Sequence, residues 1–218
     1  MSRTYDCNDT AERARGIPAA VRAVRQGKLV VLPTDTVYGL GCDAFSPDAV
    51  AALLAAKGRG RDLPVPVLVG SPETLAGVSA QSGAVVQSLV EAFWPGGLTL
   101  VCRQQPSLQW DLGDTAGTVA VRMPLHPVAL EVLGETGPMA VSSANLSGQP
   151  PPRSGPQARE QLGEAVTVYL DSDETEDDVP STIVDVTGTV PRVLRVGAVS
   201  VDTLREVAPE TTAPAGPP

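Results

Sequence analysis

Apolar positions along this chain switch repeatedly between helical and strand-like spacing. Residues at i, i+3, i+4 and i+7 predict one amphipathic helix, and they are Ile17, Ala20, Val21 and Val24. Gly27 follows them as a helix stop. A second helix is predicted to begin within Ser-Pro-Asp at 46–48, because Ser caps helices, Pro fits the first helical position and Asp suits the first turn. Further helices are expected at 84–93, 127–133 and 201–207.

Short apolar runs predict strands between and after these helices. They lie at 29–32, 65–69, 98–101, 118–121, 139–142, 166–170, 182–186 and 192–196. Pro66 directs its strand toward a sheet edge, because proline cannot donate to a strand ladder. Several strands follow one another without an intervening helix, which favours a mixed α/β sheet with flanking helices over a strictly alternating, doubly wound sheet.

Length and composition indicate one folded domain and a short tail. The chain has 218 residues, of which 42% are hydrophobic, enough for a single large core. We expect the domain to span residues 11–207. The remaining segment, 208–218, is rich in Pro, Thr and Ala and carries Glu210 as its one charge, so we expect a disordered tail there.

Targeting signals and cysteines indicate a cytoplasmic protein. No apolar run approaches the roughly 20 residues of a membrane helix, and residues 1–9 lack the basic-then-apolar pattern of a signal peptide, so we expect no membrane association. The three cysteines, Cys7, Cys42 and Cys102, are widely spaced, and the single histidine, His126, is near none of them. A disulfide framework and a protein metal site are therefore not expected.

The charge balance argues against general nucleic-acid binding. The formal net charge is −9, from 16 basic and 25 acidic residues. Nucleic-acid binding depends on clustered Lys and Arg, which an acidic chain supplies poorly. Part of the negative charge lies in the run 171–178, DSDETEDD, which we interpret as a solvated loop.

Familiar nucleotide and hydrolase motifs do not explain the chain. Residues 39–44, GLGCDA, match GxGxxA after a strand, but Phe-Ser-Pro separates them from the next helix, which disfavours a dinucleotide-binding turn. The sequence contains neither GxxxxGK[ST] nor GxSxG, so a P-loop and a hydrolase elbow are excluded at the motif level. His126, which precedes Pro127, is interpreted as capping or packing at a helix start, with general-base catalysis as the alternative.

Four polar segments stand at predicted strand or helix ends, where binding groups collect, and they are 33–41, 57–61, 118–124 and 142–148. In the second, KGRGR, flanking glycines let the exposed cations Lys57 and Arg59 approach a bulky anion; the alternative is that they complement a helix dipole. Arg122 ends an apolar strand and therefore requires an anionic partner. With hydroxyl-rich loops and few acid–base groups, this inventory suits phosphoryl or nucleotidyl transfer.

Seven motifs occur in the order PTDTVYGLG, KGR, FWPGGLTLV, VRMP-HP, SANLSG, STIVD and LRVGAVS, and together they resemble the YrdC family from about residue 11 to 207. The resemblance implies a twisted mixed α/β sheet around a concave basic pocket, in a short, single-domain form. It also implies a threonylcarbamoyl-AMP synthase, which converts ATP, L-threonine and bicarbonate to threonylcarbamoyl-AMP and pyrophosphate. The product serves the modification of adenosine 37 in tRNAs that read ANN codons.

The resemblance also assigns roles to individual residues. Lys57 and Arg59 match the family's KxR pair and are expected to hold phosphate or carboxylate groups in catalysis. L-threonine is expected on Thr36, Arg122, Ser142 and Ser181, and ATP on Arg59, Thr118, Ser143, Ala144, Asn145 and Arg195. Leu63 and Leu68 depart from the family, which often has a polar residue at the first position and His at the second, so side-chain contacts there are expected to be lost.

Cofactors and partners follow from the same resemblance. Mg²⁺ is expected to arrive with ATP, and a downstream threonylcarbamoyl transferase complex to take the product, with at most weak direct contact to tRNA. A non-catalytic RNA-binding or regulatory member of the family is the first alternative, and the net charge and the 3% aromatic content disfavour it. A carbamoyl-adenylate-forming enzyme of hydrogenase maturation is the second, disfavoured because its zinc-finger and acylphosphatase segments are missing from this sequence.

Overall fold

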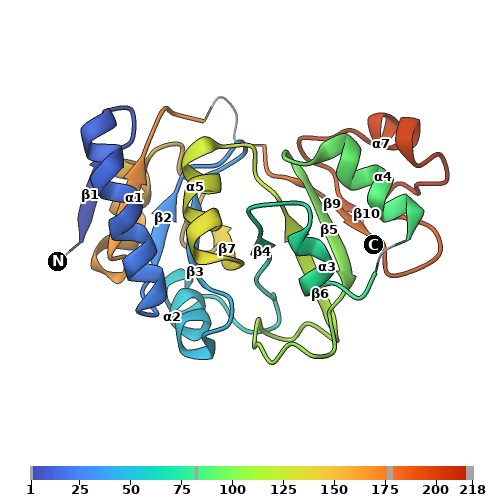
Figure 1. The fold of residues 1–218 in the computed structure, drawn as a ribbon, viewed down its shortest axis with the longest axis horizontal. Helices are drawn as coiled ribbons and strands as arrows, with labels where there is room; N and C mark the ends of the chain where they lie inside the picture. The colour runs from blue at the N-terminus through green and yellow to red at the C-terminus, as the bar shows by residue number, and fades with distance from the viewer. Residues whose placement is uncertain (1, 82, 176–178, 215–218) are drawn as a thin grey trace.

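The computed structural model describes residues 2–81, 83–175 and 179–214, and a single mixed sheet forms the centre of the fold (Figure 1). The strand order is β1-β8-β2-β3-β7-β4-β6-β5-β9-β10, with parallel pairs such as β5 with β9 beside antiparallel pairs such as β3 with β7. The strands are β1 (Arg3–Asp6), β2 (Val30–Leu32), β3 (Gly39–Asp43), β4 (Val67–Leu68), β5 (Leu98–Arg103), β6 (Thr118–Arg122), β7 (Met139–Ser143), β8 (Val168–Asp171), β9 (Thr182–Asp185) and β10 (Arg192–Arg195). The predicted mixed α/β sheet is confirmed.

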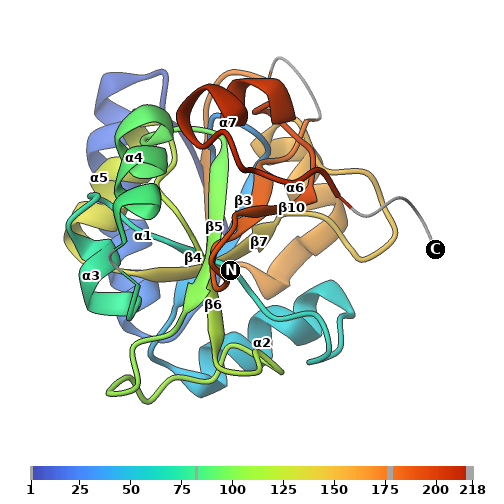
Figure 2. The same cartoon turned by 90° about the vertical axis from the view of Figure 1, so that its right-hand side faces the viewer.

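Helices flank this sheet, and none of those described is long and apolar enough to cross a membrane. They are α1 (Thr10–Arg25), α2 (Pro47–Lys57), α3 (Thr74–Val78), α4 (Ala84–Phe93), α5 (Pro127–Thr136), α6 (Gly155–Leu162) and α7 (Val201–Val207), with a short 3-10 turn at Gly163–Ala165. Figures 1 and 2 show α1 beside α5 at one end of the sheet and α4 beside α7 at the other. The predicted start of α2 is confirmed, because Ser46 Oγ accepts from Ala49 N at 3.3 Å.

Two groups of buried apolar side chains hold the helices to the sheet. The larger group extends through most of the fold and includes Leu40, Leu53, Leu100 and Val121. The smaller group joins α1 and α5 to the sheet and includes Val24, Leu32, Val132 and Leu170. The helix face predicted from the apolar spacing at 17–24 is therefore the face that α1 buries.

β4 lies inside the sheet, between β7 and β6, so the predicted edge position is wrong. Pro66 stands one residue before the strand and interrupts no ladder bond of β4 itself. Its carbonyl oxygen still accepts from Val141 N at 2.8 Å. The proline thus shortens the predicted strand to Val67–Leu68 without moving it to an edge.

The glycine-rich segment after the loop at 33–38 is a strand, β3, and not a flexible turn. A Cβ atom on Gly39 would lie 2.6 Å from Val141 Cγ1, and one on Gly41 would lie 2.9 Å from Met139 Cε. Both glycines therefore allow β3 to pack closely against its neighbour β7. A dinucleotide-binding turn at 39–44 is excluded by this arrangement.

The predicted domain limits, 11–207, are too narrow at both ends. β1 pairs in parallel with β8 and precedes residue 11. Beyond residue 207, Ala208 and Thr211 are buried, and Thr212 exchanges hydrogen bonds with the backbone of Pro191 and Val193, both at 3.0 Å. The prediction of disorder is thus wrong for 208–212, because this segment pairs with the edge strand β10; residues 215–218 lie outside the described residues.

Candidate active site

A tight loop at 33–38 joins the antiparallel strands β2 and β3 and presents Thr36. We call it the Thr36 loop. Thr34 Oγ1 donates to Val37 O at 2.7 Å and accepts from Thr36 N at 3.2 Å, so the turn satisfies much of its own backbone. Both threonine side chains are buried. The loop is therefore held in shape before any ligand arrives.

Arg122, at the end of β6, is fixed on three sides. Its Nε donates to Gly96 O at 2.9 Å, its Nη1 to Thr36 Oγ1 at 2.7 Å and its Nη2 to Asp35 Oδ1 at 2.5 Å. The residue is only 6% exposed, and burial lowers the pKa of its guanidinium while Asp35 opposes that shift. The anionic partner required by the sequence is therefore Asp35, which the Thr36 loop supplies.

Asp35 is a candidate site residue that the motif assignments missed. Its Oδ1 also accepts from Leu125 N at 2.8 Å, so one carboxylate oxygen joins the Thr36 loop to the segment after β6. The side chain of Asp35 is 16% exposed. The sequence signal was the requirement for an anion near Arg122, but nothing in the spacing selected this carboxylate among many.

Lys57 is buried, which contradicts the prediction of an exposed cation. It is 3% exposed, and its Nζ donates to the backbone carbonyls of Ser143 at 2.5 Å and Asn145 at 2.6 Å. Burial first, and then the charge of Arg59, lower the pKa of this amine to about 8. The direct contacts of Lys57 therefore hold the loop that follows β7.

Arg59 stands beside Lys57 with an incomplete set of partners. Its Nη1 donates to Ser142 Oγ at 3.2 Å, whereas its buried Nε has no hydrogen-bond partner among the described residues. Burial lowers the pKa of this guanidinium, and Asp62 partly offsets that effect. Across the described part of the chain, neither Lys57 nor Arg59 has an ion-pair partner. This pair of cations is therefore suited to an incoming anion.

The loop at 142–149, which carries the SAN motif, is tied at both sides. Asn145 Nδ2 donates to the carbonyls of Leu146 and Gln149, each at 2.8 Å. Ala144 N donates to Tyr38 O at 2.8 Å and so joins this loop to the Thr36 loop. The predicted contacts Ser142, Ser143, Ala144 and Asn145 thus lie between the two cationic residues of the KxR pair and the Thr36 loop.

Ser181 and Arg195 form a third cluster near Arg122. Ser181 Oγ lies 2.7 Å from Thr99 Oγ1, and Arg195 donates to Ser181 O through Nε at 3.1 Å and Nη2 at 2.8 Å. Burial, and then the positive charge of Arg122, lower the pKa of Arg195. The two guanidinium groups are therefore close enough to repel each other. Like charges in this position favour an anionic ligand between them.

Thr118 lies at the opposite end of β6 from Arg122. Its hydroxyl donates to Thr115 O at 2.8 Å. Val119 and Val121 point into the core, so strand alternation places Thr118 on the face that also carries Arg122. The structure therefore puts this predicted ATP contact on the same strand face, at a distance from the Arg122 cluster.

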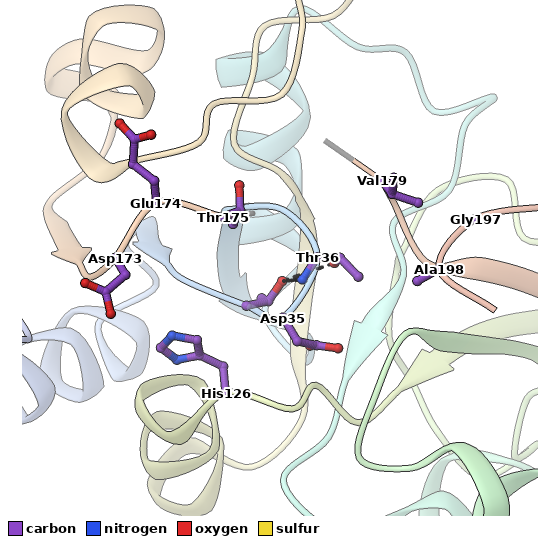
Figure 3. Close-up of a pocket in the computed structure, with 10 residues that line it drawn as sticks. Asp35, Thr36, His126, Asp173, Glu174, Thr175, Val179, Gly197 and Ala198 are labelled. Atoms are coloured by element: carbon purple, nitrogen blue, oxygen red, sulfur yellow. Dashed lines mark hydrogen bonds between the residues drawn. The ribbon is translucent and has the colours of Figure 1, made fainter. Parts of the chain in front are cut away.

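A cavity of about 520 Å³ opens beside the Thr36 loop (Figure 3). It is lined by Thr34, Asp35, Thr36, His126, Asp173, Glu174, Thr175, Val179, Gly197 and Ala198, and we call it the Thr36 cavity. Three of these residues are acidic and none is Lys or Arg, so the basic lining expected from the resemblance is not found here. Arg122 lies beside this cavity, since it donates to Thr36 and Asp35 of its lining.

The acidic run contributes Asp173 and Glu174 to the lining of this cavity, and both are exposed. Its interpretation as a solvated loop is wrong for Asp171, which belongs to β8. Asp171 ends β8 and accepts from Gly155 N at 2.7 Å. Tyr38 Oη is 3.2 Å from Asp171 Oδ1 and accepts from Ser172 N at 3.0 Å, which anchors the turn that carries Asp173. Residues 176–178 lie outside the described residues.

His126 is the N-cap residue of α5, yet its side chain makes no capping hydrogen bond. Its Nδ1 is buried and has no partner among the described residues. Burial lowers the pKa of the imidazole, and the charge of Asp35 opposes that shift. The capping interpretation is therefore wrong, and the ring faces the Thr36 cavity with unused hydrogen-bonding capacity. The described residues contain no group of three His, Cys, Asp or Glu side chains placed to hold a metal.

Comparison with known proteins identifies the family. The Sua5/YciO/YrdC family model, described as "Telomere recombination", matches residues 22–197. The chain belongs to this family. It is 60% identical over 207 residues to a Mycobacterium tuberculosis protein named "Putative threonylcarbamoyl-AMP synthase", and the match covers 95% of both chains. It is 36% identical to the threonylcarbamoyl-AMP synthase of Pyrococcus abyssi, where the match covers 89% of this chain and 57% of the relative.

Solved structures of the family share the fold. The structure of P. abyssi Sua5 complexed with L-threonine superposes with a TM-score of 0.89 at 33% identity, covering 98% of this chain and 62% of that one. Escherichia coli YciO superposes with a TM-score of 0.83 at 23% identity, which supports the fold alone. The predicted family and its twisted mixed sheet are confirmed, whereas the roles of single residues stay predictions.

Proposed function

We propose that this member of the Sua5/YciO/YrdC family is an L-threonylcarbamoyladenylate synthase, a nucleotidyltransferase. The observation that carries the proposal is the 60% identity, over 95% of both chains, to a relative named as a threonylcarbamoyl-AMP synthase. In the reaction, L-threonine and bicarbonate form N-carboxy-threonine, whose new carboxylate attacks the α-phosphate of ATP. Pyrophosphate leaves, and threonylcarbamoyl-AMP is the product.

The threonine site is proposed at Arg122 and Thr36. A relative in this family has been solved with L-threonine, and here Thr36 is held against a buried arginine by a 2.7 Å hydrogen bond. Arg122 uses three of its five donors on the protein, which leaves two N–H groups for a carboxylate. Ser142 and Ser181 are proposed to complete this site.

The nucleotide is proposed to occupy the surface that joins the other clusters. Arg59 has an unpartnered Nε and would bind the phosphates, with backbone and side-chain groups of Ser143, Ala144 and Asn145 beside it. Arg195 and Thr118 would contact the remainder of ATP. Lys57 is proposed to act on this site by holding the 142–149 loop, since its donors already meet Ser143 O and Asn145 O.

The partners beyond the substrates are proposals as well. Mg²⁺ would enter as the magnesium complex of ATP, because triphosphates bring this ion with them. The product would pass to a threonylcarbamoyl transferase complex that modifies adenosine 37 of tRNAs reading ANN codons, and a cytoplasmic location suits that role. Direct contact with tRNA would be weak, since the chain carries a net charge of −9.

Two assays test the function against its alternative. The protein is incubated with MgATP, L-threonine and ¹⁴C-bicarbonate, and label in an adenylate is measured together with pyrophosphate. We expect both products, and neither when threonine is omitted. A non-catalytic RNA-binding member would instead give no pyrophosphate and would retain tRNA on a nitrocellulose filter at moderate salt, and that result would overturn the proposal.

A further inference from the structure

The reaction proposed above releases a proton that some group must accept. L-threonine enters as an ammonium ion, and its nitrogen bonds to the carbon of bicarbonate while a carbon–oxygen bond of bicarbonate breaks. Of the three ammonium protons, one stays on nitrogen and one leaves with the departing hydroxide as water. The third must go to a base near the amino group, and the family motifs assign no residue to this task.

We propose that His126 is this proton acceptor, facing the amino group of threonine inside the Thr36 cavity. The inference rests on the proposed function. Both Thr36 and His126 line the cavity, and Thr36 is bonded to Arg122 at 2.7 Å. The amino group of an α-amino acid is one carbon atom away from its carboxylate. A threonine whose carboxylate meets Arg122 beside Thr36 therefore places its amino group in or at the mouth of the same cavity.

The other titratable groups of the cavity are engaged or turned away. Asp35 accepts from both Arg122 and Leu125 N through one oxygen. Asp173 accepts from the side-chain amide of Asn8 at 3.2 Å. Figure 3 shows the carboxylate of Glu174 pointing away from His126 and from the Thr36 loop. His126 is the lining group that is free to exchange a proton.

The state of the imidazole suits a base at neutral pH. Its buried Nδ1 has no partner among the described residues, so no hydrogen bond commits the ring to one role. Burial, with help from the charge of Arg13 on α1, lowers the pKa of His126 below its usual 6.5, while Asp35 and Asp173 oppose this. The neutral form therefore prevails at pH 7, and this is the form that accepts a proton.

The same surroundings stabilise the charge after transfer. The imidazolium ion that forms lies close enough to Asp35 and Asp173 for both to raise its pKa. The proton can then leave through the open cavity to water. Asp35 thus stabilises two positive charges, the permanent charge of Arg122 and the charge that His126 carries only after it has accepted the proton.

The chain has a single histidine, so one imidazole signal reports the site directly. The ring resonances of His126 are followed by NMR against pH, with and without L-threonine at a concentration that saturates the thermal-shift response. We expect threonine to move these resonances and to shift the titration to lower pH, because a nearby ammonium ion disfavours imidazolium. Resonances that stay in place at saturating threonine would overturn the proposal.

A matched pair of variants tests the chemical step. His126→Gln should lower turnover on the order of 10²-fold with little change in KM for threonine, as for a lost general base. The wild-type kcat/KM for threonine should fall at acidic pH, with the midpoint of the fall below the usual histidine pKa of 6.5, and the variant should lack this acid limb. Leu125→Ala alters the exposed neighbour, 58% accessible, and should keep wild-type turnover and pH dependence.

The outcomes separate this inference from the function on which it rests. Wild-type pyrophosphate release that depends on threonine and bicarbonate establishes the synthase whatever His126 does. If His126→Gln then matches the wild type across the pH range, the proton acceptor is another group and the inference fails. If added imidazole restores turnover to His126→Gln, but not to a variant such as Arg59→Ala, the role is chemical and not merely one of packing.

Discussion

The positive charges of two regions, the first at Arg122 and the second at the Lys57–Arg59 pair, have different kinds of partner within the protein. Arg122 meets a carboxylate, Asp35, within the protein, whereas Lys57 and Arg59 meet backbone carbonyls and the Ser142 hydroxyl. An arginine with its own counter-ion is held in place before a ligand binds. In the second region the charge of Arg59 helps to lower the pKa of Lys57, and Arg59 Nε has no hydrogen-bond partner among the described residues, so a bound anion would supply the missing partner. The first region is a preformed clamp, and the second becomes complete only with its ligand.

The largest effect is expected when Asp35 is removed from the first region. Asp35→Ala leaves the charge of Arg122 buried without a partner, which should lower the free energy of unfolding by about 3 kcal/mol. Denaturant unfolding measures this change. Asp111→Ala, which breaks the exposed pair between Arg61 and Asp111, is the control and should cost about 1 kcal/mol or less. Equal losses in the two variants would mean that the buried pair of Asp35 and Arg122 contributes no more to stability than the exposed pair does.

Removing Arg59 should affect turnover and hardly affect folding. Arg59→Ala deletes the donor proposed for the phosphates, and we expect a loss on the order of 10²–10³ in turnover, as for a missing transition-state donor. Arg59→Lys should also be impaired, because Lys lacks the planar fork. Pyrophosphate release and melting temperature are measured together. Arg61→Ala, in the same segment but exposed, should retain its turnover, and normal turnover in Arg59→Ala would refute the anion site.

Replacing Lys57 should destabilise the protein, contrary to the expectation for an exposed cation. Lys57→Met keeps the length of the side chain but leaves Ser143 O and Asn145 O without their donor, which should cost about 2 kcal/mol. The chain has one other lysine, Lys28, which is exposed, so Lys28→Met is a matched control and should be nearly neutral. Unfolding curves that do not distinguish the two variants would show that Lys57 does not hold the loop.

The difference in free energy of unfolding between the wild type and Lys57→Met should also depend on pH. This effect is expected to be smaller than the loss caused by the substitution itself, but its sign is defined. Lys57 has a pKa of about 8 in the fold, whereas an ordinary lysine in the unfolded chain has a pKa of 10.5, so between these pH values the unfolded chain binds more protons. The wild type should therefore gain stability relative to Lys57→Met as pH rises from about 8 to 10.5, with no relative change below this range. Paired unfolding curves at several pH values measure it, and a relative loss on raising pH would contradict the buried position.

Local chemistry was enough to predict many of the elements. Ser46 and Pro47 start α2 as expected, and Gly58 ends it in the left-handed region at φ 61°. These signals act within one turn of the chain. By contrast, β3 was not among the predicted strands. Its glycines pack against Val141 and Met139 of β7, a strand about a hundred residues later in the sequence, and local spacing gives no sign of that contact.

The active-site candidates show the same limit. The family motifs named Arg122 and Lys57, but their partners are Asp35 and the 142–149 loop, which are 87 and 86 positions away in sequence at the contacting residues. Neither pairing leaves a mark in local spacing. For His126 the sequence left two interpretations open, capping or packing at a helix start and general-base catalysis. The missing capping hydrogen bond and the place of His126 in the Thr36 cavity are visible only in the fold.

The place of β8 in the sheet determines when the fold can close. β8, at Val168–Asp171, lies between β1 and β2 and is the only described neighbour of β1. During synthesis, the first strand to leave the ribosome therefore waits for most of the chain before it can pair. Such long-range pairing slows folding and leaves a strand edge open to other chains. Nascent chains that stall before Val168 should thus need protection from chaperones more than those that stall after Asp171.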